Sequence, residues 1–560
     1  MTNDFNFSKT ALVAALGLLP VNYAFSQGIP DAGSLQQQIQ QDQKLRLPSK
    51  SAPEKSRAPD AMPATTGIVI TAKQFKFVGN TLLTNEQLAP LVSEYLNKPL
   101  DYNQLQEATA AIADAYREAG WIVKAYLPKQ DVTDGIITIQ IIEAVFGGSR
   151  LETQSTRINQ QQIQQYIEAA QAANQPLNED DLERAILLID DLPGIAAAAI
   201  LQKGAGENQT DVAVKLTDQA LFSGEVGGDN FGYRATGGER LTAKINVNSP
   251  SGIGDQISGN MMHSDGSDYG RLAYTLPVGN DGWRVGINGS YLAYNLVQEQ
   301  FKDLEANGTS QIYGAEASYP LIRSRMKNLY FAINFDHKQF NNLANQVKTS
   351  DYEMNNVSVG LNGNLYDNIA GGGANTAGIT LTQGDLNLGK LDLSENPALN
   401  GKFTKVNYSL SRQQVITENT TAYVGFSGQV ATTNLNSAEQ LYLGGASGVR
   451  AYPANEGWGS EGQVVNVELR NQLPYGFNFT PFYDLGHIRR NANNSANVTP
   501  NSYTLQGAGV SIAWQASYGL NLKATWARRI GDNPNPGMNG KDQDGTLHPD
   551  RFWLQASMPF

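Results

Sequence analysis

Two short segments toward the C-terminal end of the 560-residue sequence hold the residues whose types and spacing could do chemistry. The first segment, 443–453, is rich in glycine and contains Gly448, Val449, Arg450 and Tyr452. The second segment, 482–486, contains Phe482, Asp484 and Gly486. An aspartate that is placed away from water must be paired, so the chemistry open to Asp484 is an ion pair with a basic side chain.

The neighbours of Asp484 indicate which way its side chain points. Phe477, Phe479, Pro481 and Tyr483 alternate along one strand, so their side chains share one face. Asp484 has the opposite parity and lies on the other face. An aspartate that met lipid would be strongly destabilising, whereas one that faces the lumen of a barrel can be paired.

The last strand of the sequence shows the same alternation in its purest form. Apolar residues occupy every second position, at Phe552, Leu554, Ala556, Met558 and Phe560. Such a face suits a strand that closes a membrane barrel, because one face meets lipid and the edge pairs with the first strand. We therefore predict an outer-membrane β-barrel.

Earlier strands repeat this pattern over residues 220–560. Leu241, Ala243 and Ile245, for example, alternate with polar residues. At roughly 20 residues per strand and connection, this length predicts about 16 antiparallel strands, an even number as in bacterial barrels. The connections include the turn 277–282 and the glycine- and asparagine-rich loops 370–375 and 531–545. A soluble β-sandwich is the alternative, but it needs neither so many strands nor an apolar closing strand.

Composition argues against several classes of function. Lys+Arg 41 against Asp+Glu 53 gives a net charge of −12, which disfavours a nucleic-acid partner because phosphate contacts need a basic face. Cysteine is absent and the four histidines are scattered, so we expect no metal site. A G-x-G-x-x-G match at 457–462 lacks a strand-to-helix context and is predicted to be a flexible loop. We expect no cofactor and no catalytic residue, and therefore not an enzyme.

The N-terminal 66 residues divide into three predicted parts. Residues 1–26 have a lysine, a short apolar stretch and a small-x-small site, which is typical of a signal peptide. Residues 27–46 contain a glutamine-rich helix, predicted from Ser34 with Ser34 and Gln37 as a capping box. This helix has too few apolar residues to be stable alone and needs a host. Residues 47–66 carry four prolines and predict an extended linker.

Two small α+β modules are predicted between the linker and the barrel, at 67–146 and 147–219. Both have two helices followed by two strands, and the helices begin near Thr84 and Asp101 in the first module and near Ile158 and Asn178 in the second. The modules form an internal repeat without strong sequence identity. Each small sheet has a free edge that can accept a strand from a partner.

The two segments that carry Arg450 and Asp484 resemble a known pair of motifs. Gly-x-x-x-Val-Arg-x-Tyr followed by Phe-x-Asp-x-Gly is similar to the lid loop and the barrel-wall motif of the BamA-like outer-membrane superfamily. In that superfamily the loop folds back into the barrel and its arginine meets the wall aspartate. The resemblance therefore places Arg450 against Asp484. Ala451 stands where the family often has glycine.

The order of parts narrows the resemblance to the two-partner secretion transporters, the TpsB or ShlB/FhaC/HecB family of haemolysin and haemagglutinin secretion proteins, with a CdiB-like branch as one candidate. The resemblance implies that the N-terminal helix plugs the barrel lumen. It also implies that the modules are POTRA domains, which bind an unfolded exoprotein in the periplasm. The barrel then exports this exoprotein across the outer membrane without ATP.

The implied partners are a large secreted exoprotein of the TpsA type, with a CdiA-like toxin as one candidate, the lipid of the outer membrane, and the barrel-assembly machinery during biogenesis. Two other functions stay open at this point. One is an assembly factor of the same superfamily that inserts other barrels. The other is a passive porin, which the two soluble modules disfavour.

Overall fold

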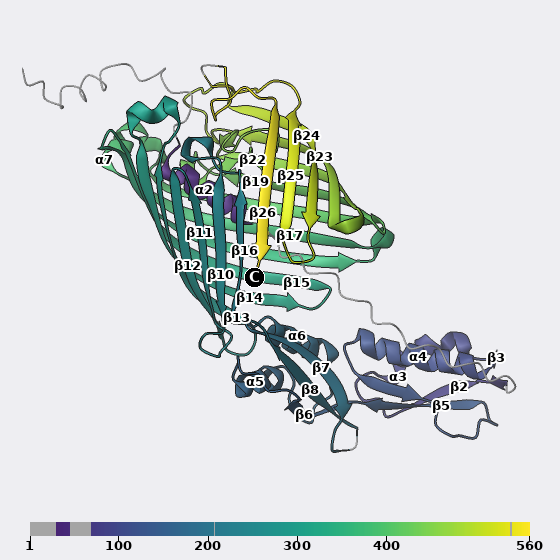
Figure 1. Ribbon diagram of the computed structural model, residues 1–560. Coiled ribbons are helices and arrows are strands. Elements are labelled where there is room, and N and C mark those ends of the chain that lie inside the picture. The colour runs from purple at the N-terminus through teal and green to yellow at the C-terminus, as the bar shows by residue number, and fades with distance from the viewer. Residues whose placement is uncertain (1–29, 45–68, 207, 538–539) are drawn as a thin grey trace, which may run out of the picture.

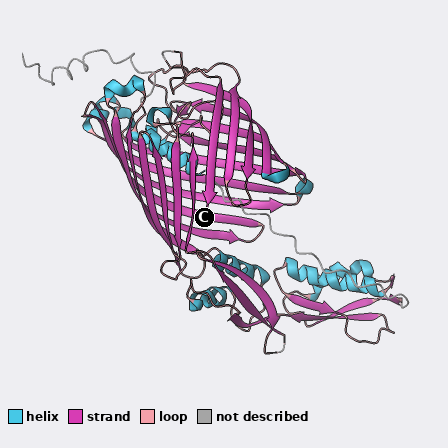
Figure 2. Cartoon of the chain, viewed as in Figure 1, coloured by secondary structure: helices cyan, strands magenta, loops and turns pink. Residues whose placement is uncertain are grey.

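The computed structural model describes residues 30–44, 69–206, 208–537 and 540–560 (Figure 1). The predicted signal peptide and the predicted proline-rich linker lie outside the described residues. The described part consists of one N-terminal helix, two small α+β modules and a large β-barrel (Figure 2). No helix within it is long and apolar enough to cross a membrane.

The barrel has the predicted architecture. Sixteen strands close in the order of the sequence, each antiparallel to its neighbours, and β26 pairs with β9 to complete the ring. The barrel strands are β9 (Phe222–Asp229), β10 (Arg240–Asn248), β11 (Gln256–Ser264), β12 (Ser267–Val278), β13 (Trp283–Asn295), β14 (Asn307–Arg323), β15 (Lys327–Ala344), β16 (Val347–Asp367), β17 (Gly373–Leu388), β18 (Gly401–Thr417), β19 (Thr420–Ala431), β22 (Glu461–Gln472), β23 (Phe477–Arg489), β24 (Ser502–Gln515), β25 (Asn521–Arg529) and β26 (Asp550–Pro559).

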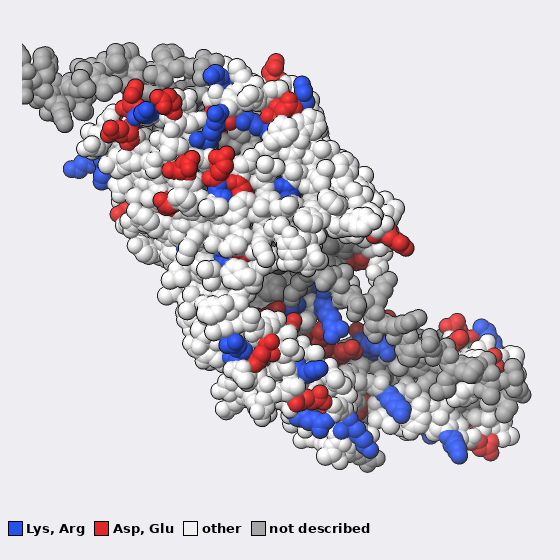
Figure 3. Space-filling model, in the orientation of Figure 1, with Lys and Arg blue, Asp and Glu red and all other residues white. Residues whose placement is uncertain are grey.

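The alternation along these strands sorts side chains between the outer wall and the lumen. Leu241, Phe552 and Leu554 point outward and are 66%, 65% and 57% exposed. Figure 3 shows the consequence on one face of the molecule, where a largely uncharged band separates the charged groups at the two ends of the barrel. Such a band matches the hydrocarbon layer of a membrane.

The seam between β26 and β9 depends on glycines. The register runs from Gln555 opposite Asp229 to Pro559 opposite Glu225. Just past the strand, the Phe560 N–H donates to the Gly224 carbonyl over 3.0 Å. A side chain at position 224 would collide with the Phe560 ring, so glycine leaves room for this aromatic side chain beside the first strand.

One predicted loop is instead a tight turn. Residues 370–375 were expected to form a long loop, but β16 ends at Asp367 and β17 begins at Gly373. Gly371 and Gly372 have φ angles of 96° and 108°, which glycine adopts without strain. The short helix η5 (Ile369–Gly371) and these glycines reverse the chain at the barrel end nearest the modules.

The first module forms around a three-stranded sheet in the order β2-β5-β4. Its elements are β1 (Ile70–Thr71), β2 (Gln74–Val78), α3 (Asn85–Leu88), η2 (Ala89–Tyr95), β3 (Pro99–Leu100), α4 (Tyr102–Glu118), β4 (Val123–Tyr126) and β5 (Ile136–Glu143). Thr84 and Asp101 cap the two helices with complete capping boxes. The helix that begins after Thr84 narrows to a 3-10 helix at Ala89, next to Pro90, which lacks an N–H donor.

The second module repeats this plan with the sheet order β6-β8-β7. Its elements are β6 (Val145–Leu151), α5 (Gln160–Ala170), α6 (Glu179–Asp190), β7 (Ile195–Lys203) and β8 (Gln209–Asp218). β6 begins at Val145, so the predicted boundary at 146/147 falls inside a strand. No loop separates the modules, because the Ala144 N–H donates to Ile122 in the first while the Val145 N–H donates to Asn208 in the second.

The second module is fastened to the near end of the barrel. Arg323, at the end of β14, donates twice to the Asp191 carboxylate, over 2.7 and 2.8 Å. Arg184 of α6 donates over 3.0 Å to the carbonyl of Asp281, which lies in the turn between β12 and β13. Contacts from the middle of α6 and from its C-cap therefore join the module to the barrel.

Candidate functional site

The long connection between β19 and β22, residues 432–460, folds back into the barrel and is called the lid loop here. It contains η7 (Ser437–Glu439), β20 (Leu441–Tyr442) and β21 (Trp458–Gly459). β20 and β21 pair with each other, so the segment 457–462 is partly a strand and not the flexible loop that its composition predicted. Leu443 and Val449 are fully buried in the cluster that this loop forms with the barrel wall.

The structure brings Arg450 and Asp484 together at the tip of the lid loop. Arg450 Nη2 lies 2.7 Å from Asp484 Oδ1, and Arg450 Nε donates to Oδ2 over 2.9 Å. The backbone N–H of Arg450 also donates to Oδ2 over 3.0 Å. Asp484 is 0% exposed and Arg450 is 5% exposed. This is a two-point ion pair out of water, the strong form of the interaction.

Four further residues complete this anchor, and the sequence analysis did not identify any of them as a partner of Arg450 or Asp484. Glu468 accepts a hydrogen bond from Arg450 Nη1 over 2.8 Å, and Asn466 Nδ2 donates to Asp484 Oδ1 over 2.7 Å. Trp553 Nε1 donates to the Arg450 carbonyl over 2.7 Å, and the Arg450 guanidinium carbon lies 3.5 Å from the centre of the Phe482 ring. We named Phe482 as part of the wall motif but not as a partner of the cation.

Three of these contacts had a signal in the sequence. Asn466 and Glu468 alternate with the apolar Val465 and Val467 on β22, so their parity places them in the lumen. Trp553 alternates in the same way with Phe552 and Leu554. The parity shows that these side chains face inward, but it does not show what they meet.

The small residues of the two motifs allow the loop to approach the wall closely. A Cβ atom at Gly448 would collide with the Leu443 carbonyl oxygen, and one at Gly486 would lie 2.7 Å from Val449 Cγ2. Tyr452 is 1% exposed beside this contact. These glycines therefore set the distance at which Arg450 can reach the aspartate.

Ala451 stands where the family often has glycine, and its methyl group lies against a glycine of the barrel wall. Gly507 lies opposite Asp484 on β24, and a Cβ atom at 507 would collide with the Ala451 methyl group. The extra methyl group at 451 is thus accommodated by the missing side chain at 507.

A second anchor fixes another part of the lid loop to strands β15 and β18 of the barrel wall. Glu439, in η7, lies 2.7 Å from Lys338 Nζ of β15 and 2.7 Å from Lys405 Nζ of β18. Asn356 Nδ2 donates to the same carboxylate over 2.7 Å. Glu439, Lys338 and Lys405 are 2%, 5% and 5% exposed. The sequence analysis missed this cluster, although the two lysines have lumen-facing parity.

The N-terminal helix α2 (Ala32–Lys44) lies in the lumen and is called the plug helix here (Figure 1). Its cap is Asp31, not Ser34 as predicted. Asp31 Oδ1 accepts from the Ser34 N–H over 2.7 Å, while Ser34 Oγ accepts from the Asp31 N–H over 3.1 Å. The box is thus shifted by three residues, with aspartate at the cap and serine at the third helical position.

The plug helix packs against η7 and the inner faces of β13, β14 and β15. Its few apolar residues, Ala32, Leu35 and Ile39, belong to a buried cluster with aromatic residues of the wall. Its glutamines face the lid loop, where Gln37 and Gln41 donate to the Gln440 carbonyl over 3.1 and 3.3 Å. The polar composition of this helix is therefore matched by a polar host.

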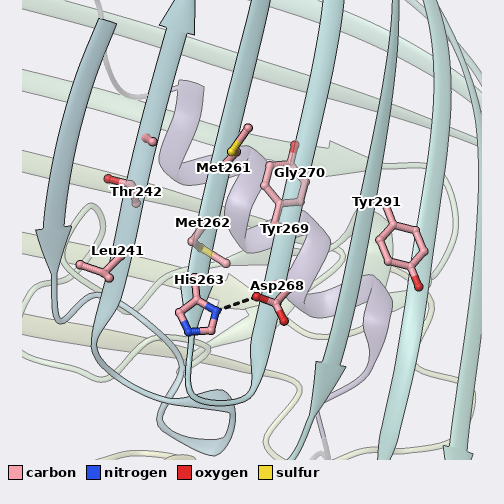
Figure 4. Close-up of a pocket in the computed structure, with 10 residues that line it drawn as sticks. Leu241, Thr242, Met261, Met262, His263, Asp268, Tyr269, Gly270 and Tyr291 are labelled. Atoms are coloured by element: carbon pink, nitrogen blue, oxygen red, sulfur yellow. Dashed lines mark hydrogen bonds and ion pairs between the residues drawn. The ribbon is translucent and has the colours of Figure 1, made fainter. Parts of the chain in front are cut away.

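A hollow on the outer wall is lined by residues of β10 to β13 (Figure 4). The described residues that line it form no buried ion pair like those that hold the lid loop. Leu241, Met261 and Tyr291 line it from the outward face, and His263 Nδ1 lies 2.6 Å from Asp268 Oδ1 at its rim. Both members of this pair are exposed. Within the described ranges, no group of three or more His, Cys, Asp or Glu residues could hold a metal ion.

Comparison with known proteins agrees with this geometry. Residues 208–514 match the family model of the haemolysin secretion/activation proteins ShlB/FhaC/HecB, and residues 70–144 match the POTRA domain of the ShlB type. The first of these matches covers more than half of the chain.

Among characterised relatives, the heme/hemopexin transporter protein HuxB of Haemophilus influenzae is 27% identical over 92% of this chain and 94% of its own length. The outer membrane transporter CdiB of Dickeya dadantii is 24% identical over 83% of this chain and 82% of its own length.

Solved structures support the fold. CdiB from Escherichia coli has a TM-score of 0.71 with 21% identity, covering 96% of this chain and 100% of that one. BamA from Haemophilus ducreyi without POTRA domains 1–3 has a TM-score of 0.52 with 14% identity, covering 88% of this chain and all of that one.

The barrel, the two modules, the plugged lumen and the family match converge on one assignment. The chain belongs to the ShlB/FhaC/HecB family and is an outer-membrane two-partner secretion transporter with periplasmic POTRA domains.

Proposed function

We propose that this transporter captures an unfolded exoprotein at the edges of its POTRA sheets and exports it after the plug helix has left the lumen. Passage needs no ATP, because folding of the exoprotein outside the cell makes export directional. The Arg450–Asp484 pair holds the lid loop in the position that export requires. The observation that carries this proposal is a lumen filled by two separate elements, of which one is anchored by buried ion pairs and the other is held mainly by neutral hydrogen bonds.

The second POTRA domain has an exposed strand edge suited to capture. Among the residues that the structure describes, β7 pairs only with β8, and Ile200 and Leu201 on β7 are 52% and 42% exposed. The opposite edge is partly covered, since the Phe146 N–H of β6 donates to the Gln175 carbonyl over 2.9 Å. An extended segment of the exoprotein can add to β7 through main-chain hydrogen bonds, which do not depend on its sequence.

The partner is a large secreted exoprotein. This chain is similar both to proteins named as heme/hemopexin transporters and to CdiB, so the CdiA-like toxin of the sequence analysis is one candidate beside a partner of a heme-uptake system. The outward apolar wall contacts membrane lipid, and we propose that the barrel-assembly machinery inserts the chain.

Secretion of a co-expressed N-terminal fragment of a neighbouring exoprotein tests the proposal. We expect the fragment in the medium with the full chain and its retention in the periplasm when residues 67–219 are deleted. Export that does not need these residues would contradict capture by the POTRA domains. Absence of export, together with loss of other outer-membrane proteins when the chain is depleted, would favour an assembly factor.

A further inference from the structure

We propose that Lys405 and Asn356 react with each other inside the barrel and become joined by an isopeptide bond, with Glu439 as the group that moves the proton. The bond ties β18 to β16 across the intervening strand β17. This inference goes beyond the proposed function, because the reaction uses only side chains of the chain itself. It is a single self-modification and not a repeated catalytic cycle.

The three side chains form one buried contact. Glu439 Oε2 lies 2.7 Å from Lys405 Nζ, and Asn356 Nδ2 donates to Glu439 Oε1 over 2.7 Å. Glu439, Lys405 and Asn356 are 2%, 5% and 2% exposed. The two oxygens of one carboxylate therefore lie between the amine that would attack and the amide nitrogen that would leave.

The asparagine amide lies over β17, on the side of its own strand where Lys405 is found. Asn356 is opposite Gly384 on β17, and Gly384 is opposite Phe403 on β18. A Cβ atom at Gly384 would collide with Asn356 Oδ1 and with the Phe403 ring. Within the described residues, Asn356 Oδ1 is buried without a hydrogen-bond partner. The missing side chain at 384 thus leaves room for the amide to meet an amine from β18.

The surroundings favour an uncharged Lys405. Lys338 Nζ also lies 2.7 Å from Glu439 Oε1, so one buried carboxylate faces two amines. Lys338 has a second carboxylate on the same face of its strand, at Asp336, whereas the residues two positions from Lys405 on β18 carry no charge. A second ammonium group here would be a poorly balanced buried charge, which is strongly disfavoured. A neutral lysine amine is a nucleophile.

The reaction balances without any further reactant. Lys405 Nζ attacks Asn356 Cγ and forms a new C–N bond. The proton that Nζ loses passes to the Glu439 carboxylate, which returns a proton to Asn356 Nδ2. The Cγ–Nδ2 bond then breaks and ammonia leaves. Because the fold already holds both groups against one carboxylate, much of the entropic barrier to their encounter is removed.

The product suits its surroundings better than the reactants do. Once Lys405 is an amide, Glu439 has Lys338 as its cation and the pair is balanced one to one. The bond also closes a covalent ring over residues 356–405. Such a ring restricts the unfolded chain in the way that a disulfide does, and this chain has no cysteine from which to form a disulfide.

Peptide mapping by mass spectrometry of the wild-type protein, purified from outer membranes, tests the proposal. We expect a branched peptide that joins Asn356 to Lys405, with the summed mass of the two linear peptides less one ammonia. Asn356→Ala, Lys405→Arg and Glu439→Gln should each lack this branch. Asn362→Ala is the matched control, since Asn362 also lies over a glycine of β17, Gly378, but away from the Glu439 cluster. This variant should keep the branch.

Two results would overturn the inference. Recovery of only unbranched peptides with Asn356 and Lys405 from folded wild-type barrels would show that the bond does not form. A branch from Asn356 to Lys338 would show that the wrong lysine has been assigned as the nucleophile. Secretion is not measured, so either result leaves the proposed export function intact.

Gel migration gives an independent check on the same samples. After boiling, a chain closed into a ring over residues 356–405 is more compact than an open one, so the wild type should migrate ahead of Asn356→Ala. Asn362→Ala should migrate with the wild type. Identical migration of the wild type and Asn356→Ala would count against the bond.

Discussion

The lid loop and the plug helix fill the same lumen but are held in opposite ways. The lid loop is bound to the barrel wall at two places by carboxylates paired with arginine or lysine, all nearly excluded from water. The plug helix rests on the lid loop and on β13 to β15 mainly through neutral hydrogen bonds and three apolar side chains. Figure 1 shows the helix inside the barrel near the end that carries the long loops.

This difference matters because a buried ion pair adds little net stability, but loss of one partner leaves the other charge buried and unpaired, which strongly destabilises the structure. An element fixed in this way has one position and resists partial displacement. An element held by replaceable hydrogen bonds can exchange them for those of another polypeptide. This contrast is what the proposed function needs, with the lid loop as the permanent part and the plug helix as the removable part of one gate.

The largest effect is expected from Asp484→Ala. The change leaves Arg450 with Glu468 alone and should destabilise the lid tip by about 3–5 kcal/mol, the usual cost of removing one partner of a buried pair. Secretion should fall more than tenfold while the barrel keeps its heat-modifiable migration in gels. Asp385→Ala, at an exposed outward position, is the control and should secrete normally.

The matched change Arg450→Ala should also reduce export and leave the barrel folded. In the double variant the two losses should not add, because both changes remove the same interaction. Additive losses, or wild-type secretion in either single variant, would remove the mechanistic role of the pair.

Glu439→Gln should act on the second anchor without touching the first. The amide keeps the shape but leaves Lys338 and Lys405 without an anion, at a cost of about 3 kcal/mol. Because the plug helix rests on η7, we expect single-channel conductance in a planar bilayer to rise, with secretion reduced severalfold. Unchanged conductance would show that the plug helix does not depend on this anchor.

Trp553→Phe should have a smaller effect on the lid tip. It removes the hydrogen bond to the Arg450 carbonyl and keeps most of the aromatic packing, for a loss of about 1 kcal/mol. Secretion should fall by less than about fivefold, in line with that energy. A loss as large as that of Asp484→Ala would mean that the closing strand controls the lid more strongly than its single bond suggests.

The smallest change is expected from Asp42→Asn at the end of the plug helix. The pair with Arg240 is partly exposed and should contribute about 0.5 kcal/mol, so open-channel events should become only about twofold more frequent. Deletion of residues 32–44 gives the upper limit and should open the channel permanently. If the deletion leaves conductance unchanged, the helix is not a plug.

Much of the fold followed from local pattern. Period-two alternation gave the barrel, its sixteen strands and the inward direction of Asp484, because the pleat of a strand forces neighbours to opposite faces. The caps at Asp101 and Asn178 followed from side-chain chemistry within one turn. The tight turn at 371–372 and the cap at Asp31 were mispredicted, since glycine-rich loops and glycine turns look alike, and two capping boxes overlapped.

The sequence by itself determined which face of each strand meets lipid and which residues face the lumen, because these depend only on order along the chain. Which lumen residues meet was decided by the tertiary structure. Glu439 reaches Lys338, 101 positions away, only because the barrel closes and the lid loop crosses its interior. Contacts across a lumen depend on curvature, register and loop path together, and no local spacing encodes them.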